Sequence, residues 1–140
     1  MSAYALKAYR STQLDARFET SDKRDLVVMM YDGAIDAIRQ AGQHASRQEA
    51  RSVSSSVSRA LTILAGLRET LDMDQGGSVA THLNDFYQYL MRRMVRAGAR
   101  AAIEELADCA DLLSQVREAW MVINPNTAAE ASRRMFLIHS

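Results

Sequence analysis

Apolar residues in the stretch 50–71 recur three and four positions apart, and this spacing constrains the fold more than any other feature of the chain. Residues at these spacings lie on one face of an α-helix, which has about 3.6 residues per turn. A helix with such a stripe is stable chiefly when the stripe packs against other helices. The stretch therefore predicts one long helix of a helical bundle. Its stripe consists of Ala50, Val53, Val57, Ala60, Leu64, Leu67 and Leu71.

Three other stretches have a similar apolar periodicity, in residues 20–43, 79–97 and 103–120. The chain has only 1 proline and 6 glycines among its 140 residues, which also favours helices. Four helices of this length, joined by short turns, pack most simply with each helix antiparallel to the next. The sequence thus predicts an all-α fold, an antiparallel up-and-down four-helix bundle.

The predicted bundle occupies residues 21–124 and leaves a segment on either side of it. Residues 1–20 have sparse apolar positions and are expected to form an N-terminal arm. Residues 125–140 follow the helix-ending Asn-Pro pair and are expected to form a tail. In this tail Thr127 and Glu130 have the spacing of a capping box, which predicts a short C-terminal helix.

The glycines have two different meanings in this pattern. Gly76–Gly77 marks a turn over 72–78, and Gly98 is expected to end the third long helix before the fourth begins. Gly33, in contrast, lies inside the apolar run Leu26–Ile35, where the helical periodicity continues unbroken. Glycine inside a helix costs about 1 kcal/mol relative to alanine. We therefore expect a second helix, or a partner chain, to pack closely against Gly33.

The composition excludes several classes of protein. The 17 basic and 17 acidic residues cancel, which removes the electrostatic argument for binding nucleic acid. No apolar run approaches the roughly 18 residues of a membrane span. Lys7 and Arg10 precede polar residues, unlike a secretory signal. The single cysteine, Cys109, suits a reducing compartment. We expect a soluble cytoplasmic protein that binds neither nucleic acid nor membranes.

A basic stripe near the end of the third predicted helix is interpreted as charge that favours a helix C-terminus. Acidic residues follow it directly, and we expect them to compensate it across the turn. The basic residues are Arg92, Arg93, Arg96 and Arg100, and the acidic ones are Glu104, Glu105, Asp108 and Asp111.

No catalytic or metal-binding pattern is found, so the chain is expected to be no enzyme and to bind no cofactor or metal. No glutamate precedes a histidine by three positions, as in di-iron bundles. A histidine-phosphotransfer domain acting through His82 is an alternative, since such domains are bundles of this size. However, Asp85 would lie one helical turn from the phosphohistidine and repel it.

The remaining candidate activity is binding of another protein. The 8 methionines of the chain suit a surface that accepts an imperfectly matched partner, although for any single methionine filling a core gap is the more common role. Leu6 and Tyr9, three positions apart in the arm, could cover such a surface in the absence of a partner.

Several short motifs, in this order and at these spacings, resemble those of the flagellar export chaperone family, the cytoplasmic flagellin-binding chaperones of bacteria. The resemblance runs from about Leu6 to Trp120, and a departure is Asp22, where the family usually has proline. The motifs are Lys7-Ala8-Tyr9, Met30-Tyr31-Asp32-Gly33-Ala34, Ala60-Leu61-Thr62-Ile63-Leu64, Gly76-Gly77, Phe86-Tyr87 and Val116-Arg117-Glu118-Ala119-Trp120.

The resemblance implies a monomer or weak homodimer that holds the disordered C-terminal segment of flagellin, prevents premature polymerisation and presents it to the flagellar export gate. It places Tyr9, Tyr31 and Asp32 near the binding surface. We add four apolar residues to this predicted surface: Leu6, Val27, Met30 and Leu64. A helical adaptor with a partner other than flagellin is a further alternative.

Overall fold

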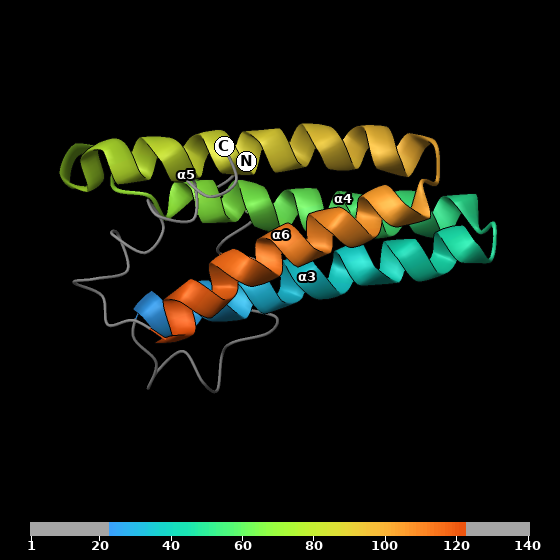
Figure 1. Ribbon diagram of the computed structural model, residues 1–140, viewed down its shortest axis with the longest axis horizontal. Helices are drawn as coiled ribbons and strands as arrows, with labels where there is room; N and C mark the ends of the chain where they lie inside the picture. Colours follow the sequence, from blue (N-terminus) through green and yellow to red (C-terminus); the bar gives the residue numbers. More distant parts are fainter. Residues whose placement is uncertain (1–22, 123–140) are drawn as a thin grey trace.

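The computed structural model describes residues 23–122 and contains four α-helices in that range. They are α3 (Lys23–Ser46), α4 (Ala50–Glu69), α5 (Met73–Ala99) and α6 (Ile103–Val122). Each helix runs antiparallel to the one before it (Figure 1). The predicted all-α four-helix bundle is therefore confirmed. The expected arm and the short C-terminal helix lie outside the described residues, and the predicted domain boundaries stay predictions.

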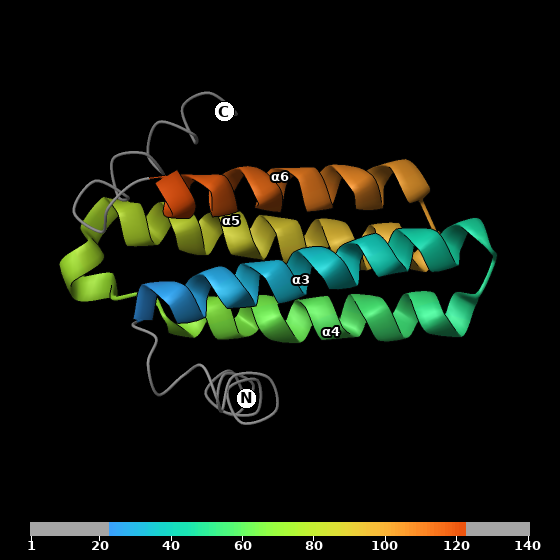
Figure 2. The same cartoon turned by 90° about the horizontal axis from the view of Figure 1, so that it is seen from below.

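The helices form a ring in which each packs against two neighbours. Helix α3 packs extensively against both α4 and α6, whereas α5 makes less extensive contacts with the same two helices. Figures 1 and 2 show the start of α3 and the end of α6 at the same end of the bundle. There the Arg24 guanidinium donates a hydrogen bond of 3.1 Å to the main-chain carbonyl of Met121.

The buried stripe of α3 is rich in small residues. Ala34, Ala37, Ala41 and Ala45 are all buried in the core. Small side chains allow helix axes to approach closely, because the spacing between packed helices depends on the side chains at the contact. The predicted close contact at Gly33, which is partly buried within α3, stays a prediction.

The corner between α3 and α4 is closed by main-chain hydrogen bonds. The N–H of Glu49 donates to the carbonyl of His44 over 3.0 Å, and the N–H of Gln48 donates to that of Ala45 over 3.1 Å. This pair of bonds is a Schellman motif, and it requires a left-handed residue at the helix end. Gln48 takes that conformation, with φ 59°.

The corner between α5 and α6 repeats this motif. Ala102 donates to the carbonyl of Ala97 over 2.9 Å, and Ala101 donates to that of Gly98 over 3.2 Å. Ala101 has φ 49°, so an alanine stands where glycine is the usual residue. The prediction that Gly98 ends the third long helix was wrong, because α5 continues to Ala99 and the left-handed residue comes later.

The predicted turn over 72–78 is also only partly correct. A first helical turn forms from Met73, and the Asp72 side chain caps it by accepting from the N–H groups of Asp74 and Gln75. The helix is then broken at Gly77, whose φ of 54° and ψ of −131° are not helical. A glycine is needed there because side chains disfavour this conformation.

Candidate protein-binding surface

Four of the predicted site residues lie in the hydrophobic core. Val27, Met30, Tyr31 and Leu64 are all buried, from α3 and α4. Their burial stabilises the bundle, at about 1.5–3 kcal/mol for each fully buried large side chain. Direct contact with a partner would require these side chains to become exposed. Their role in binding stays a prediction.

Tyr31 is joined across the core to Tyr87 of α5. The two phenolic hydroxyls share a hydrogen bond, and the ring centroids lie 6.4 Å apart. Both side chains are buried, and buried hydroxyl groups need a hydrogen-bond partner, which each of these two supplies to the other. Burial, reinforced by the neighbouring Tyr31, raises the pKa of Tyr87 well above its usual value of 10.0.

Asp32, another predicted site residue, lies at the surface of α3 and contacts α6. Its carboxylate accepts a hydrogen bond from the Nε of Arg117, whose Nη1 also donates to Glu118 over 3.1 Å. The hydrogen bond to Asp32 raises the pKa of the Arg117 guanidinium. The Asp32 side chain is 47% exposed, so it is accessible to a partner without rearrangement. Leu6 and Tyr9 lie outside the described residues.

Apolar side chains are left partly uncovered along the line where α4 meets α5. Two contacts fix the register of this antiparallel pair. The Nε of Arg68 donates to the Oδ1 of Asn84 over 2.9 Å at one end. At the other end, a Cβ added to Gly98 would lie 2.9 Å from the Cγ2 of Val57, so the α5 backbone at Gly98 comes very close to the Val57 side chain.

Between these contacts the register places Leu61 of α4 at the level of Met91 and Val95 of α5. Leu61 lies four positions after Val57 and therefore on the same flank of α4. Met91 and Val95 lie seven and three positions before Gly98 and therefore share its flank of α5. Leu61 and Met91 are partly buried, and Val95 is 52% exposed. We call these three residues the α4/α5 apolar strip. Sequence analysis missed the strip because its residues lie beside the main stripes, and only the helix register brings them together.

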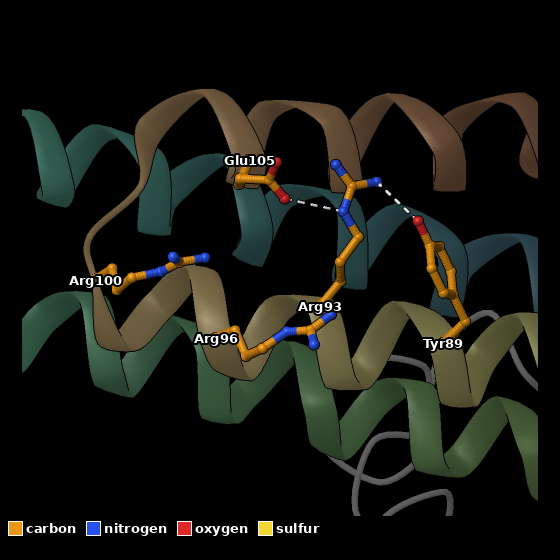
Figure 3. Close-up of a pocket in the computed structure, with 5 residues that line it drawn as sticks. All are labelled: Tyr89, Arg93, Arg96, Arg100 and Glu105. Atoms are coloured by element: carbon orange, nitrogen blue, oxygen red, sulfur yellow. Dashed lines mark hydrogen bonds and ion pairs between the residues drawn. The ribbon is translucent and has the colours of Figure 1, made fainter.

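The opposite flank of α5 faces α6 and carries a basic hollow of about 410 Å³, lined by Tyr89, Arg93, Arg96, Arg100 and Glu105. Figure 3 shows Arg93 between Glu105 and Tyr89, with Arg96 and Arg100 along the same side of α5. Arg93 donates to Glu105 over 3.0 Å, to Asp108 over 3.4 Å and to the Tyr89 hydroxyl over 3.3 Å.

The expected compensation of the basic stripe is therefore achieved for one of its arginines. The hydrogen bond from Arg93 lowers the pKa of Glu105 and raises that of the guanidinium. Within residues 23–122, Arg92, Arg96 and Arg100 form no ion pair with an acidic side chain. Three of the four basic groups thus stay available to an external acceptor.

The candidate reactive side chains within residues 23–122 are not arranged for catalysis. Cys109 is buried on the core stripe, and its burial raises the thiol pKa to about 11, which keeps it protonated at neutral pH. His82 lies on the exposed side of α5, next in sequence to buried Leu83. Among residues 23–122 no group of three or more His, Cys, Asp or Glu side chains could hold a metal ion. None of the described helices combines the length and apolar character of a membrane span.

The antiparallel bundle thus carries two surface features, a partly exposed apolar strip and a basic hollow, of the kind through which helical proteins bind other proteins. Comparison with known proteins makes this class specific. The family described as "Flagellar protein FliS" matches residues 5–127. The chain is 29% identical over 133 residues to the flagellar secretion chaperone FliS of Salmonella typhimurium, covering 94% of this chain and 98% of that protein.

Two further relatives agree. The flagellar secretion chaperone FliSB of Pseudomonas aeruginosa is 27% identical, with 83% of this chain and 92% of that protein covered. FliS of Vibrio cholerae is 28% identical, with 90% and 96% covered. The chain is thus a flagellar secretion chaperone rather than an enzyme. It belongs to the FliS family.

Proposed function

We propose that this protein binds the disordered C-terminal segment of flagellin in the bacterial cytoplasm, prevents its premature polymerisation and delivers it to the flagellar export gate. Membership of the FliS family supports the proposal over phosphotransfer through His82. The observation that carries it is the α4/α5 apolar strip, because a strip between two helices is suited to the apolar face of an amphipathic segment.

The physical basis is coupled folding and binding. A disordered segment loses conformational entropy when it becomes helical on a surface, and apolar burial must offset this loss. Val95, the most exposed member of the strip, offers apolar area that is in contact with water in the free protein. Partly buried Leu61 and Met91 extend this area toward the core, and methionine adapts to an imperfectly matched side chain.

The proposal is tested by calorimetric titration of the full chain with the C-terminal segment of the host's flagellin. We expect binding with a favourable enthalpy and a negative heat-capacity change, the signature of folding on binding. Val95→Glu should weaken binding about tenfold or more, since a buried carboxylate without a partner is strongly unfavourable. Wild-type protein that releases no heat and does not co-elute with the segment would contradict the assignment to flagellin.

Met73→Glu provides a matched control. Met73 is 48% exposed, a fraction similar to the 52% of Val95, and its substitution introduces the same charge. It lies in the first turn of α5, away from the strip. Its substitution should leave the affinity nearly unchanged. Equal weakening by both variants would show that added negative charge, and not the strip, determines the effect.

The residues predicted from the sequence remain part of the proposed surface. Leu6 and Tyr9 would compete with the cargo or contact it, and Asp32 would offer its exposed carboxylate. A Leu6→Ser/Tyr9→Ser double variant should therefore change the affinity for the flagellin segment. Its thermal unfolding should match that of the wild type, and unchanged affinity would remove the arm from the mechanism.

A further inference from the structure

The basic hollow between α5 and α6 has a charge excess that the bundle itself does not neutralise. Its lining contains three arginines and one glutamate, and that glutamate is already engaged by Arg93. Arg96 and Arg100 are exposed and form no ion pair within residues 23–122. Two guanidinium groups one helical turn apart therefore face the hollow with their hydrogen-bond donors available.

Arg93 gives the hollow a fixed inner wall. Its side chain is held between the carboxylates of α6 and the ring of Tyr89, with its guanidinium carbon 5.9 Å from the ring centroid. A side chain fixed in this way loses little further entropy when a ligand binds beside it. Tyr89 is 44% exposed and offers an apolar ring face next to the charged groups.

We propose that this hollow is a second docking site, which binds an acidic helical segment of a partner protein. Two carboxylates four positions apart on such a segment have the same spacing as Arg96 and Arg100. Each carboxylate can accept charge-assisted hydrogen bonds from one of the two guanidinium groups. An apolar side chain about two helical turns from the carboxylate that pairs with Arg96, on the side away from Arg100, would lie on Tyr89. The site is on the flank of α5 away from the α4/α5 apolar strip, so it extends the proposed function without depending on flagellin as the cargo.

The experiment measures binding of a fluorescent, end-capped alanine-based helical peptide with two glutamates four positions apart to the full chain at low salt. We expect saturable binding that weakens as salt is added, because exposed ion pairs are screened. Arg96→Gln and Arg100→Gln should each weaken binding about threefold, the effect of one partly exposed charge pair. The same peptide with glutamines in place of the glutamates should not bind.

Arg92→Gln is the matched control, because Arg92 is an exposed arginine of the same helix that does not line the hollow. It should change the affinity far less than Arg96→Gln. An equal effect of Arg92→Gln would overturn the site in favour of general attraction to a basic surface. The proposal also fails if the wild type does not bind the glutamate peptide, or if a short RNA of the same charge displaces it at lower concentration.

Discussion

Helices α3 and α5 lie diagonally opposite in the bundle and are packed very differently. Helix α3 buries a broad stripe that includes four alanines and packs extensively against both neighbours. Helix α5 packs less extensively, is broken at Gly77, and leaves Met73, Tyr89 and Val95 exposed. Both surfaces proposed for binding include residues of α5. The bundle thus concentrates close packing in α3, whereas the α4/α5 apolar strip and the basic hollow lie mainly on α5.

The largest change in the free energy of unfolding is expected when an apolar side chain is truncated in each helix. Ile38→Ala in α3 removes a fully buried side chain and should lower the free energy of unfolding by about 3 kcal/mol. Val95→Ala in α5 should change it by no more than about 0.5 kcal/mol, because Val95 is largely exposed. Chemical denaturation measures both values. Similar losses for the two variants would contradict the division between the helices.

The hydrogen bond between Tyr31 of α3 and Tyr87 of α5 links these two helices across the core. Tyr31→Phe leaves the buried Tyr87 hydroxyl without the partner shown in the structure, and should cost about 1–3 kcal/mol of folding free energy. The Tyr31→Phe/Tyr87→Phe double variant should cost less than the sum of the two single variants, as a double-mutant cycle would measure. Additive losses would mean that the hydroxyls are not coupled.

The same pair predicts a dependence on pH. Unfolded tyrosine loses its proton near pH 10, whereas the raised pKa of Tyr87 keeps the folded form protonated at higher pH. The stability that depends on this protonated form is fully present below about pH 10 and decreases as the pH rises further. Denaturation at about pH 9 and about pH 11 should show a smaller loss for Tyr87→Phe than for the wild type. An identical loss in the two proteins would exclude Tyr87 as the group that titrates.

Two glycines allow a direct comparison of packing. A Cβ at Gly98 of α5 would meet Val57, a buried and β-branched residue that cannot easily turn away, whereas a Cβ at Gly42 of α3 meets nothing within 4 Å. Gly98→Ala should therefore destabilise the protein by about 1–2 kcal/mol. Gly42→Ala should stabilise it by up to about 1 kcal/mol. Thermal unfolding distinguishes these signs, and Val57→Ala should reduce the loss in the Gly98→Ala background.

The smallest expected effect is at the corner after α5. Ala101 has φ 49°, a left-handed conformation that glycine adopts without steric cost. Ala101→Gly should raise the free energy of unfolding by about 0.5–1 kcal/mol. Ala107→Gly on the exposed side of α6 is the control and should lower it by a similar amount, because Ala107 is helical. Destabilisation by both changes would show that the corner does not strain its alanine.

Much of the fold could be predicted from the sequence, because helical periodicity is a local signal. Most of the stripes of the four helices, and the burial of Cys109, follow from residues three and four positions apart. In the stripe predicted for α4, however, Ala50 is exposed and Leu71 lies beyond the end of the helix. The role of Gly98 could not be predicted, since a glycine near a helix end indicates either a break or a close approach. Nothing marked Ala101 as the left-handed residue, because alanine normally favours the right-handed helix.

The candidate surfaces were less predictable, because they depend on the register between helices. The sequence gives no reason to distinguish Arg93 from Arg96, since both belong to the same basic stripe. In the structure, Arg93 forms ion pairs with Glu105 and Asp108, because the register of α5 and α6 places it opposite them. Leu61 lies just beside its helix's main stripe and becomes notable only opposite Met91 and Val95. Conversely, Tyr31 was predicted near the binding surface and is buried in the structure, and its role in binding stays a prediction.

The hydrogen bond from Arg24 to Met121 has a mechanical consequence. It places the start of α3 beside the end of α6, so a force applied to the chain on either side of the bundle acts across this helix pair rather than along it. The contacts between the two helices would then break one turn at a time, as in opening a zipper, instead of all at once under shear. Pulled from its ends, the bundle should therefore open at low force from this end, with the corners at Gln48 and Ala101 remote from the first break.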